Sequence, residues 1–230
     1  MKPEIRHELR NYIEQEIIPR YRTFDRAHNL DHVQTAITRS LTLAANYEVN
    51  PEMVYTIAAY HDTGLVNGRE NHHLDAGQIL ESDPELRRWF SAEEIRTMRE
   101  AVEDHRASSS HAPRSIYGCI VAEADRMIDP ETIIRRTVQY GLAHYPALDR
   151  EGHYDRCVKH LREKYAEGGY LRLWIEESEN ARRLDTLRQI IRDPQRLREI
   201  FDKLFEAETT TGKESGVRKA IEGKEGPKKQ

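Results

Sequence analysis

Apolar residues recur every three or four positions along most of the chain, and polar residues fill the places between them. This spacing predicts amphipathic α-helices, because residues three and four apart lie on one face of a helix. In the first segment, Leu9, Ile13 and Ile17 define such a face, and the predicted helix ends before Pro19. The strict alternation of apolar and polar residues that is typical of β-strands is absent. We therefore expect an all-α protein.

Residues that start and stop helices divide the rest of the sequence. Asn50 followed by Pro51 indicates a helix start, and Ser91 with Glu94 has the spacing of a capping box. The further predicted helices cover residues 29–45, 51–61, 73–80, 91–105, 115–128, 130–140, 152–166, 170–192 and 194–206. The expected architecture is a compact bundle of many helices.

The helical pattern continues to Glu206 without an internal repeat, so we expect one all-helical domain over residues 1–206. From Ala207 to Gln230, apolar residues become rare, whereas Gly, Thr and Lys are frequent. This composition predicts a flexible polar tail over residues 207–230.

The chain has 230 residues, of which 37% are hydrophobic and 33% charged, so it can bury a sizeable core. Its net charge of −4 argues against a duplex nucleic acid as partner, because such proteins present positive charge to phosphates. No apolar run is long enough to cross a membrane, and only two cysteines are present. We expect a cytoplasmic protein without a membrane partner, and the oligomeric state is open.

The sequence AAYHDTGL, at residues 58–65, ends a predicted helix with two adjacent ionisable residues. His61 follows Ala58 by three positions and Ile57 by four, which places its imidazole on the buried face. Asp62 stands directly beside it. A buried polar group needs a partner, which is either a hydrogen-bonding group or a metal ion.

His32, His73, His105 and Asp125 share this feature, since each lies at the end of a predicted helix or on its apolar face. A buried carboxylate is destabilising unless a cation or hydrogen bonds compensate its charge. Imidazole and carboxylate together suit Fe, Mn, Zn, Co or Ni. A metal site is the favoured interpretation, and a polar network without metal is the alternative.

Three local sequences, HNLDHV, AAYHDTGL and IVAEADRMI, resemble the H…HD…D motif of the HD-domain superfamily of metal-dependent phosphohydrolases. The resemblance covers about residues 25–128 and implies an all-helical core. It also implies that His32, His61, Asp62 and Asp125 hold a metal ion. The sequence NHHLDAG resembles the family's H-x-x-x-Gly/Ser step, which selects His73 rather than His72.

The same resemblance implies that His73 and His105 either hold a second metal ion or contact phosphate, with Asp62 as a bridging ligand in the first case. The cofactor is expected to be divalent Mn, Fe, Co, Ni or Zn, with Mg as an alternative. One ion is expected, and a second is left open. Asp62 is also the candidate catalytic residue, which orients or deprotonates a water molecule. His28 either contacts substrate or a ligand side chain, or simply packs in a loop.

The expected function is hydrolysis of a phosphoester or phosphoanhydride in a small phosphorylated molecule, a nucleotide among the candidates, by a metal-activated water. Two alternatives stay open. One is a di-iron oxygenase on the same scaffold, and the other is a non-catalytic metal-containing module for binding or regulation.

Several basic residues are expected to lie on the surface. Arg106 and Arg126 directly follow proposed ligands, and neighbouring residues on a helix diverge by about 100°. A later strip of basic residues predicts a solvated helix face rather than a binding site. This strip comprises Arg156, Lys159, His160 and Lys164.

Overall fold

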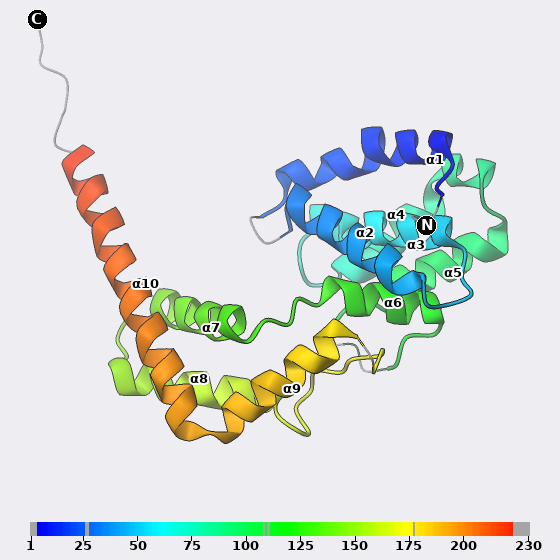
Figure 1. Cartoon of the computed structure of the whole chain (residues 1–230). Coiled ribbons are helices and arrows are strands. Elements are labelled where there is room, and N and C mark those ends of the chain that lie inside the picture. The colour runs from blue at the N-terminus through cyan, green and yellow to red at the C-terminus, as the bar shows by residue number, and fades with distance from the viewer. Residues whose placement is uncertain (1–3, 26–27, 108, 110, 177, 223–230) are drawn as a thin grey trace, which may run out of the picture. The chain divides into compact units, whose positions relative to one another are not determined.

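The computed structural model describes residues 4–25, 28–107, 109, 111–176 and 178–222, and for residues 211–222 it describes the backbone alone. These ranges are helical and contain no β-strand, which confirms the predicted all-α class (Figure 1). The chain divides into two compact units, Met1–Met127 with Arg172–Ala181, and Ile128–Leu171 with Arg182–Gln230. This division does not test whether the units fold as one domain, so the single domain over residues 1–206 stays a prediction.

The first unit contains most of the predicted helices. In chain order they are α1 (His7–Tyr12), a π-helical turn (Ile13–Ile17), a 3-10 helix (Ile18–Thr23), α2 (Leu30–Ala44), α3 (Pro51–Tyr60), a 3-10 turn (Thr63–Asn67), α4 (His72–Ser82), a 3-10 turn (Pro84–Arg88), α5 (Ala92–Glu103) and α6 (Ile116–Asp125).

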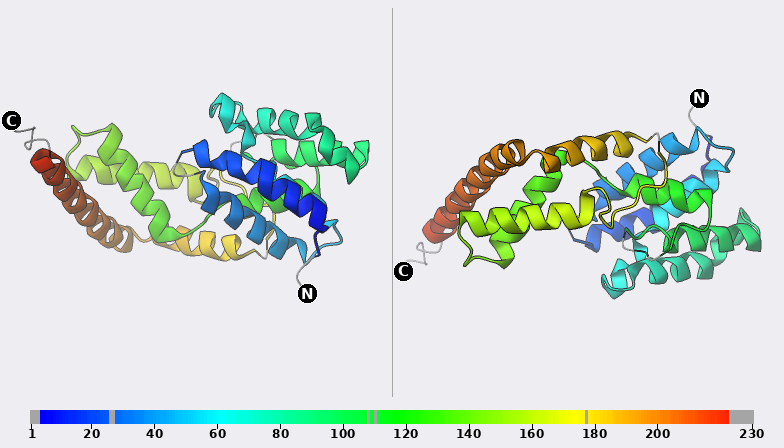
Figure 2. Two further views of the ribbon diagram at one scale, coloured as in Figure 1. Left: turned by 90° about the horizontal axis from the view of Figure 1, so that it is seen from above. Right: turned by 90° about the horizontal axis from the view of Figure 1, so that it is seen from below.

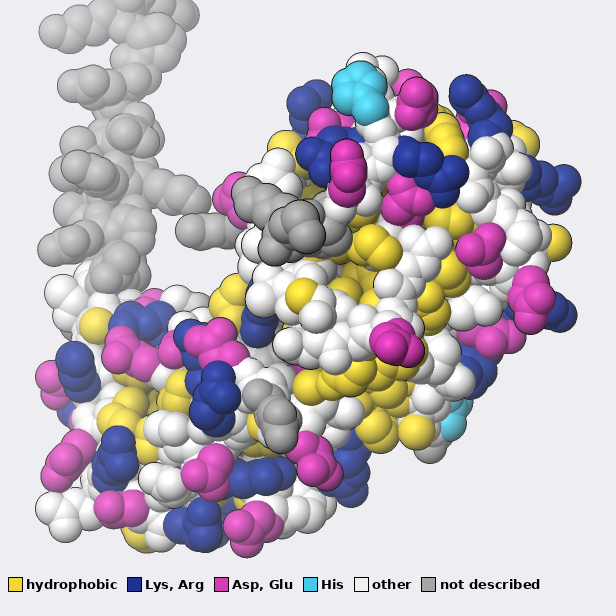
Figure 3. Space-filling view, turned by 45° about the vertical axis from the view of Figure 1, so that its right-hand side comes forward, with side chains coloured by type: hydrophobic (Ala, Val, Ile, Leu, Met, Phe, Trp, Pro, Cys, Tyr) yellow, Lys and Arg dark blue, Asp and Glu magenta, His cyan; other side chains and the backbone are white. Residues whose placement is uncertain are grey.

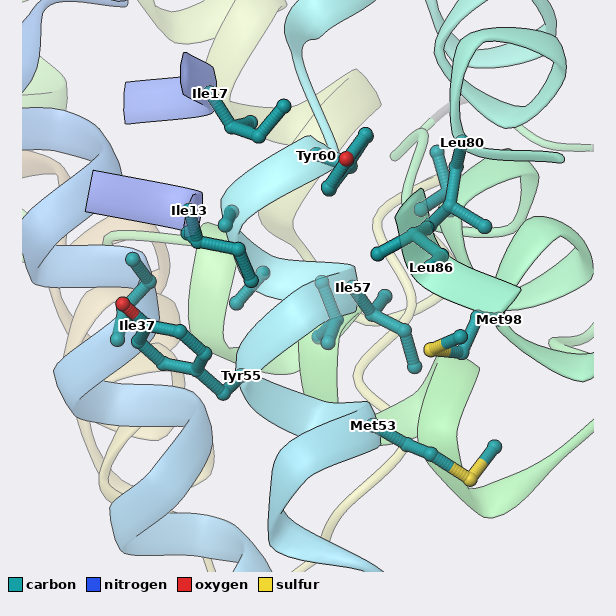
Figure 4. Packing of buried hydrophobic residues seen from close by; sticks show 14 of the residues in the cluster. Ile13, Ile17, Ile37, Met53, Tyr55, Ile57, Tyr60, Leu80, Leu86 and Met98 are labelled. Carbon is teal, nitrogen blue, oxygen red and sulfur yellow. The ribbon is translucent and has the colours of Figure 1, made fainter. Parts of the chain in front are cut away.

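Helix α3 forms the centre of this unit, because it contacts α2, α4, α5 and α6. Nearly all of its residues are buried, as a helix enclosed on several sides requires. Figure 4 shows Tyr55 of α3 beside Ile37 of α2, and Ile57 directed toward Met98 of α5. The core therefore holds the end of α3, and with it the His-Asp pair, in a fixed position.

The predicted helix starts are confirmed by their caps. The Asn29 side chain accepts a hydrogen bond from the backbone N–H of His32, and Asn50 accepts one from Glu52. Ser91 and Glu94 form the complete capping box. These caps satisfy backbone donors that have no partner within the helix.

The opening segment keeps a helical path for longer than its α-helix. Helix α1 ends at Tyr12, and the chain continues through the π-helical turn into the 3-10 helix that contains Pro19. Proline fits there because the first turn of a helix needs no N–H donor from it. The face formed by Leu9, Ile13 and Ile17 is fully buried, as predicted.

The prediction of one helix over residues 170–192 was wrong in its first half. Helix α9 (Glu179–Arg192) begins nine residues later, and the described residues before it, 170–176 and 178, are not helical. The reason is the carboxylate of Glu123, which is fully buried in α6. It accepts hydrogen bonds from the Trp174 backbone N–H and from the Ser178 hydroxyl. The segment stays non-helical because it satisfies this buried charge.

The second unit is built from α7 (Pro130–His144), α8 (Arg150–Tyr165), most of α9 and α10 (Pro194–Glu222). Helix α7 packs against α8 and against α10 (Figure 2). Helix α10 continues beyond Glu206 into the predicted tail, where Glu208 accepts hydrogen bonds from Arg135 and Gln139. Residues 223–230, the end of that tail, lie outside the described residues.

No described helix has both the length and the apolar character that a membrane span requires. On the face shown in Figure 3, cationic and anionic side chains are interspersed. That face therefore carries no broad region of positive charge of the kind that favours binding to the phosphate backbone of a nucleic acid.

Candidate metal centre

A fully buried tyrosine fixes the end of α3. The Tyr21 hydroxyl donates to the Ala59 carbonyl at 3.0 Å and accepts from the backbone N–H of Asp62 at 3.2 Å. The Thr63 hydroxyl donates to the Tyr60 carbonyl at 2.7 Å. As a result, His61 and Asp62 stop the helix with their side chains inside the protein, 0% and 3% exposed. Tyr21 lies 41 residues before Asp62, so the sequence pattern did not reveal it.

The four residues of the H…HD…D motif meet at one point. Ligand atoms of His32, His61, Asp62 and Asp125 all lie within 4.8 Å of one another. Asp62 Oδ2 is 3.1 Å from His32 Nε2 and 3.2 Å from His61 Nε2. Asp125 Oδ1 is 3.3 Å and 3.5 Å from the same two nitrogens. We call these four residues the first group.

The other oxygen of Asp62 faces a second group. Asp62 Oδ1 lies 3.6 Å from His72 Nε2 and 3.5 Å from His105 Nε2. These three residues also lie within 4.8 Å as potential ligands. One nearly buried carboxylate is therefore shared between two groups of imidazoles, one group at each oxygen.

The imidazoles are oriented by backbone carbonyls. His61 Nδ1 is 2.8 Å from the Ala58 carbonyl, His105 Nδ1 is 2.6 Å from that of Val102, and His72 Nδ1 is 2.8 Å from that of Arg69. A carbonyl oxygen can only accept, so Nδ1 carries the proton in all three. Each Nε2 consequently points at Asp62, and in the neutral imidazole its lone pair is available for a metal ion.

The structure places His72, not His73, beside Asp62, which corrects the sequence assignment of the second group. His73 is not part of either group, and its Nδ1 is buried without a partner among the described residues. Both histidines lie three or four positions before the buried Ala76, so helical spacing did not separate them. The first turn of α4 packs on Gly64, and this contact turns His72 toward Asp62.

His28 precedes the N-cap Asn29 and thus lies in the loop, as that cap predicts. Its Nδ1 is 2.8 Å from Asp25 Oδ1, and its ring lies edge-on to His32 with centroids 5.6 Å apart. His28 accordingly contacts His32, and it belongs to neither group.

Arg126 was expected on the surface but is only 7% exposed. Its guanidinium donates to the Ala122 carbonyl, while its Nε has no partner among the described residues. Burial lowers its pKa, and the charges of Asp125 and Glu123 oppose that effect. Arg126 is therefore a buried cation at the end of α6, directly after Asp125.

The carboxylates and imidazoles shift one another's protonation. Burial lowers the pKa of His61, but Asp62 and Asp125 raise it well above its usual range, and the pKa of His32 is also raised. Burial raises the pKa of Asp62, but His61 and the hydrogen-bonded histidines hold it well below its usual range. Burial also raises the pKa of Asp125, but hydrogen bonds with His32 and His61 hold it below its usual range. The buried Asp62 and the partly buried Asp125 thus attract positive charge, which protons supply when no metal ion is bound.

The donor set fits a divalent transition metal. Ligand atoms about 2.1 Å from one ion lie roughly 3.0–3.4 Å apart at octahedral or tetrahedral angles. The nitrogen–oxygen separations in the first group are 3.1–3.5 Å. These side chains are therefore already spaced like the ligands of a single ion. Mixed imidazole and carboxylate ligands suit Mn, Fe, Co, Ni or Zn. Chemically, the arrangement can hold one ion in the first group and a second beside Asp62 Oδ1.

Comparison with known proteins agrees with this geometry. The family model of the HD domain matches residues 29–128, which include every residue of both groups. No curated protein and no solved structure matches the chain. The family match and the assembled His-Asp cluster agree: residues 29–128 of this chain match the HD domain, and the cluster is consistent with the metal site of that family.

Proposed function

We propose that this protein is a metal-dependent phosphohydrolase that cleaves a phosphoester or phosphoanhydride in a small phosphorylated molecule, with nucleotides among the candidates. HD domains are generally found in metal-dependent hydrolases, and this supports the reaction class. The observation that carries the proposal is the position of Asp62, whose two oxygens face two separate groups of ligands.

In this proposal His32, His61, Asp62 and Asp125 hold the ion. When bound, a divalent ion lowers the pKa of a coordinated water and polarises a P–O bond. Asp62 Oδ2 belongs to the ligand set, whereas Oδ1 faces His72 and His105. Asp62 Oδ1 is thereby placed to accept a hydrogen bond from the attacking water and to orient it. Tyr21 holds the backbone of Asp62, so the carboxylate keeps this position.

Two arginines close to the start of α4 are the proposed contacts for phosphoryl oxygens. The Arg106 guanidinium donates to the Glu70 carbonyl at 2.6 Å, two residues before α4 begins. Arg69 NH2 lies 3.5 Å from His28 Nε2, and its side chain is 70% exposed. A guanidinium group can donate two parallel hydrogen bonds to two phosphate oxygens, and it stabilises the negative charge that develops on them.

The proposed location is the cytoplasm, and a duplex nucleic acid is not a proposed partner. Both cysteines, Cys119 and Cys157, are free thiols, as is typical in a reducing compartment. The net charge of −4 supports a small anionic substrate held by a metal ion rather than a polyanion held by surface charge.

The test is a panel of phosphate monoesters, phosphodiesters and nucleoside phosphates, assayed with Mn²⁺, Co²⁺, Ni²⁺, Zn²⁺ and Mg²⁺. We expect hydrolysis by the wild type to require a divalent ion, and Asp62→Asn to lose about a hundredfold or more of that activity. Asp31→Asn is the matched control, because Asp31 is exposed and directly precedes His32. Absence of hydrolysis in metal-loaded protein, with a specific ligand bound and unchanged, would favour the non-catalytic module.

A di-iron oxygenase is the second candidate, and the shared carboxylate favours it. Two imidazoles on each side of Asp62 provide places for two ions bridged by one carboxylate. Iron and dioxygen chemistry is common with such ligands. Protein isolated without added metal, containing iron in both groups and consuming oxygen in the presence of substrate, would support this candidate over the hydrolase.

A further inference from the structure

The second unit contains a cavity of about 430 Å³ between α7 and α8. This volume falls within the range of small-molecule sites in proteins. The lining residues come from one face of each helix, at helical spacing. They are Ile133, Arg136, Thr137, Tyr140, Arg156, His160, Lys164 and Tyr165. Two packed helices usually present apolar residues to each other, so a basic lining at this position needs an explanation.

The lining is rich in basic residues. Arg136, Arg156, His160 and Lys164 line the cavity, and no acidic residue does. Among the described side chains, neither Arg136 nor Arg156 forms an ion pair. Burial lowers the pKa of His160, and the charges of Lys164 and Arg156 lower it further. The cavity thus carries a positive potential that an anion would relieve.

Arg156 is held in place rather than extended into solvent. Its guanidinium donates to the Thr137 carbonyl and lies over the rings of Tyr140 and Tyr145, at 5.7 and 5.6 Å from their centroids. A Cβ atom at Gly141 would come within 2.7 Å of this guanidinium, so the glycine makes room for it. The Arg156 Nε is buried and has no partner among the described residues. A buried donor without an acceptor is costly, and an anion in the cavity would stabilise the positive charge of this guanidinium.

Tyrosines complete the cavity with neutral donors. Burial raises the pKa of Tyr165 to about 12, so its hydroxyl keeps its proton. The Lys164 ammonium lies 5.2 Å from the centroid of the Tyr165 ring. The prediction of a solvated face for the basic strip was therefore wrong for three of its residues. Arg156, His160 and Lys164 line the cavity, and Lys159 does not.

We propose that this cavity is a binding site for a small phosphorylated anion, held by Arg136, Arg156 and His160. The feature that would be recognised is a phosphate group, whose oxygens would accept hydrogen bonds from the guanidinium groups. The site has no residue in common with the metal centre, so it does not depend on the proposed hydrolase function.

The test uses the full chain, labelled with nitrogen-15 and titrated with inorganic phosphate at constant ionic strength. The Nε–H signal of Arg156 reports directly on the unpartnered donor. We expect this signal to shift and to saturate in the wild type, and Arg136→Gln to weaken the binding about tenfold. Arg136 is exposed, so this variant keeps the fold even where Arg156→Gln alters the packing of α8 on α7.

Arg162→Gln is the matched control, because Arg162 is an exposed cation on α8 that does not line the cavity. Its removal should change the affinity by less than about twofold. Phosphate held at the metal centre would leave the Arg156 signal unshifted and would bind Arg136→Gln as it binds the wild type. That outcome would overturn the proposal, as would an equal loss of affinity in Arg162→Gln and Arg136→Gln.

Discussion

The carbonyl oxygen of His72 lies so close to Gly64 that a Cβ atom at Gly64 would approach it to 2.0 Å. The same Cβ would lie 2.5 Å from the Ala76 backbone nitrogen. The first turn of α4 therefore packs directly on the turn after Asp62. This close approach, rather than an unusual backbone angle, requires glycine at position 64, and it brings His72 to within 3.6 Å of Asp62.

Gly64→Ala should destabilise the protein and displace His72. The clash is with backbone atoms, which cannot rotate away, so we expect a loss of about 1–3 kcal/mol or more in the free energy of unfolding. Urea unfolding of the metal-free protein measures this. Gly152→Ala is the control, since its Cβ would meet only side-chain atoms, those of Leu148 and Asp149 at 3.1 and 3.3 Å. Equal stability of Gly64→Ala and wild type would contradict the packing described here.

Substitutions at His72 and His73 separate the structural assignment from the sequence assignment. We expect His72→Gln to prevent uptake of a second metal ion, because His72 Nε2 lies beside Asp62 Oδ1. His73→Gln should bind metal as the wild type does, because His73 belongs to neither group. Elemental analysis after equilibration with excess metal and desalting measures both. Loss of the second ion in His73→Gln with retention in His72→Gln would reverse the assignment.

Metal affinity should rise with pH. The pKa values of His32 and His61 are raised in the metal-free protein by the carboxylates beside them, so these imidazoles are protonated up to a higher pH than usual. A metal ion must displace those protons. The association constant should therefore grow by about tenfold per pH unit for each proton released, until both histidines are neutral. Competition with a chelator of known pH dependence measures it, and an affinity that did not vary with pH would disprove this reasoning.

Glu123→Gln should loosen the segment Arg172–Ala181. The Trp174 N–H and the Ser178 hydroxyl both donate to the Glu123 carboxylate. In the variant one of them would face an amide NH₂ group, which cannot accept a hydrogen bond. We expect a loss of about 1–3 kcal/mol and faster hydrogen exchange at Trp174. Glu85→Gln is the control, because Glu85 pairs with Arg88 at an exposed position and should contribute about 1 kcal/mol at most. Unchanged exchange at Trp174 would show that Glu123 does not hold the segment.

Local chemistry made much of the fold and part of the site predictable. Helix starts at Asn50 and Ser91 depend on caps within three residues, so the sequence contains the whole signal. The four residues of the first group were predictable because three short local sequences resemble the H…HD…D motif, although their side chains meet only in the fold. For the helix starts, the deciding interactions are near in the chain.

The errors arose where a distant partner decides the structure. Glu123 lies about fifty residues before the segment that binds it, so helical spacing alone extended a helix through Trp174. His72 and His73 fit the buried face of α4 about equally well, and only the packing of α4 on Gly64 selects between them. Arg126 was assigned to the surface because its spacing on the helix does not reveal which parts of the chain cover it in the fold.

The central claim is that Asp62 holds a catalytic metal ion, and the metal content of Asp62→Asn tests it most directly. The wild type, Asp62→Asn and Asp31→Asn are purified without added metal and compared by elemental analysis. We predict at least about one divalent transition metal per chain in the wild type and in Asp31→Asn, and almost none in Asp62→Asn. Equal metal in Asp62→Asn and wild type, or no metal in any of the three even after reconstitution, would contradict the claim.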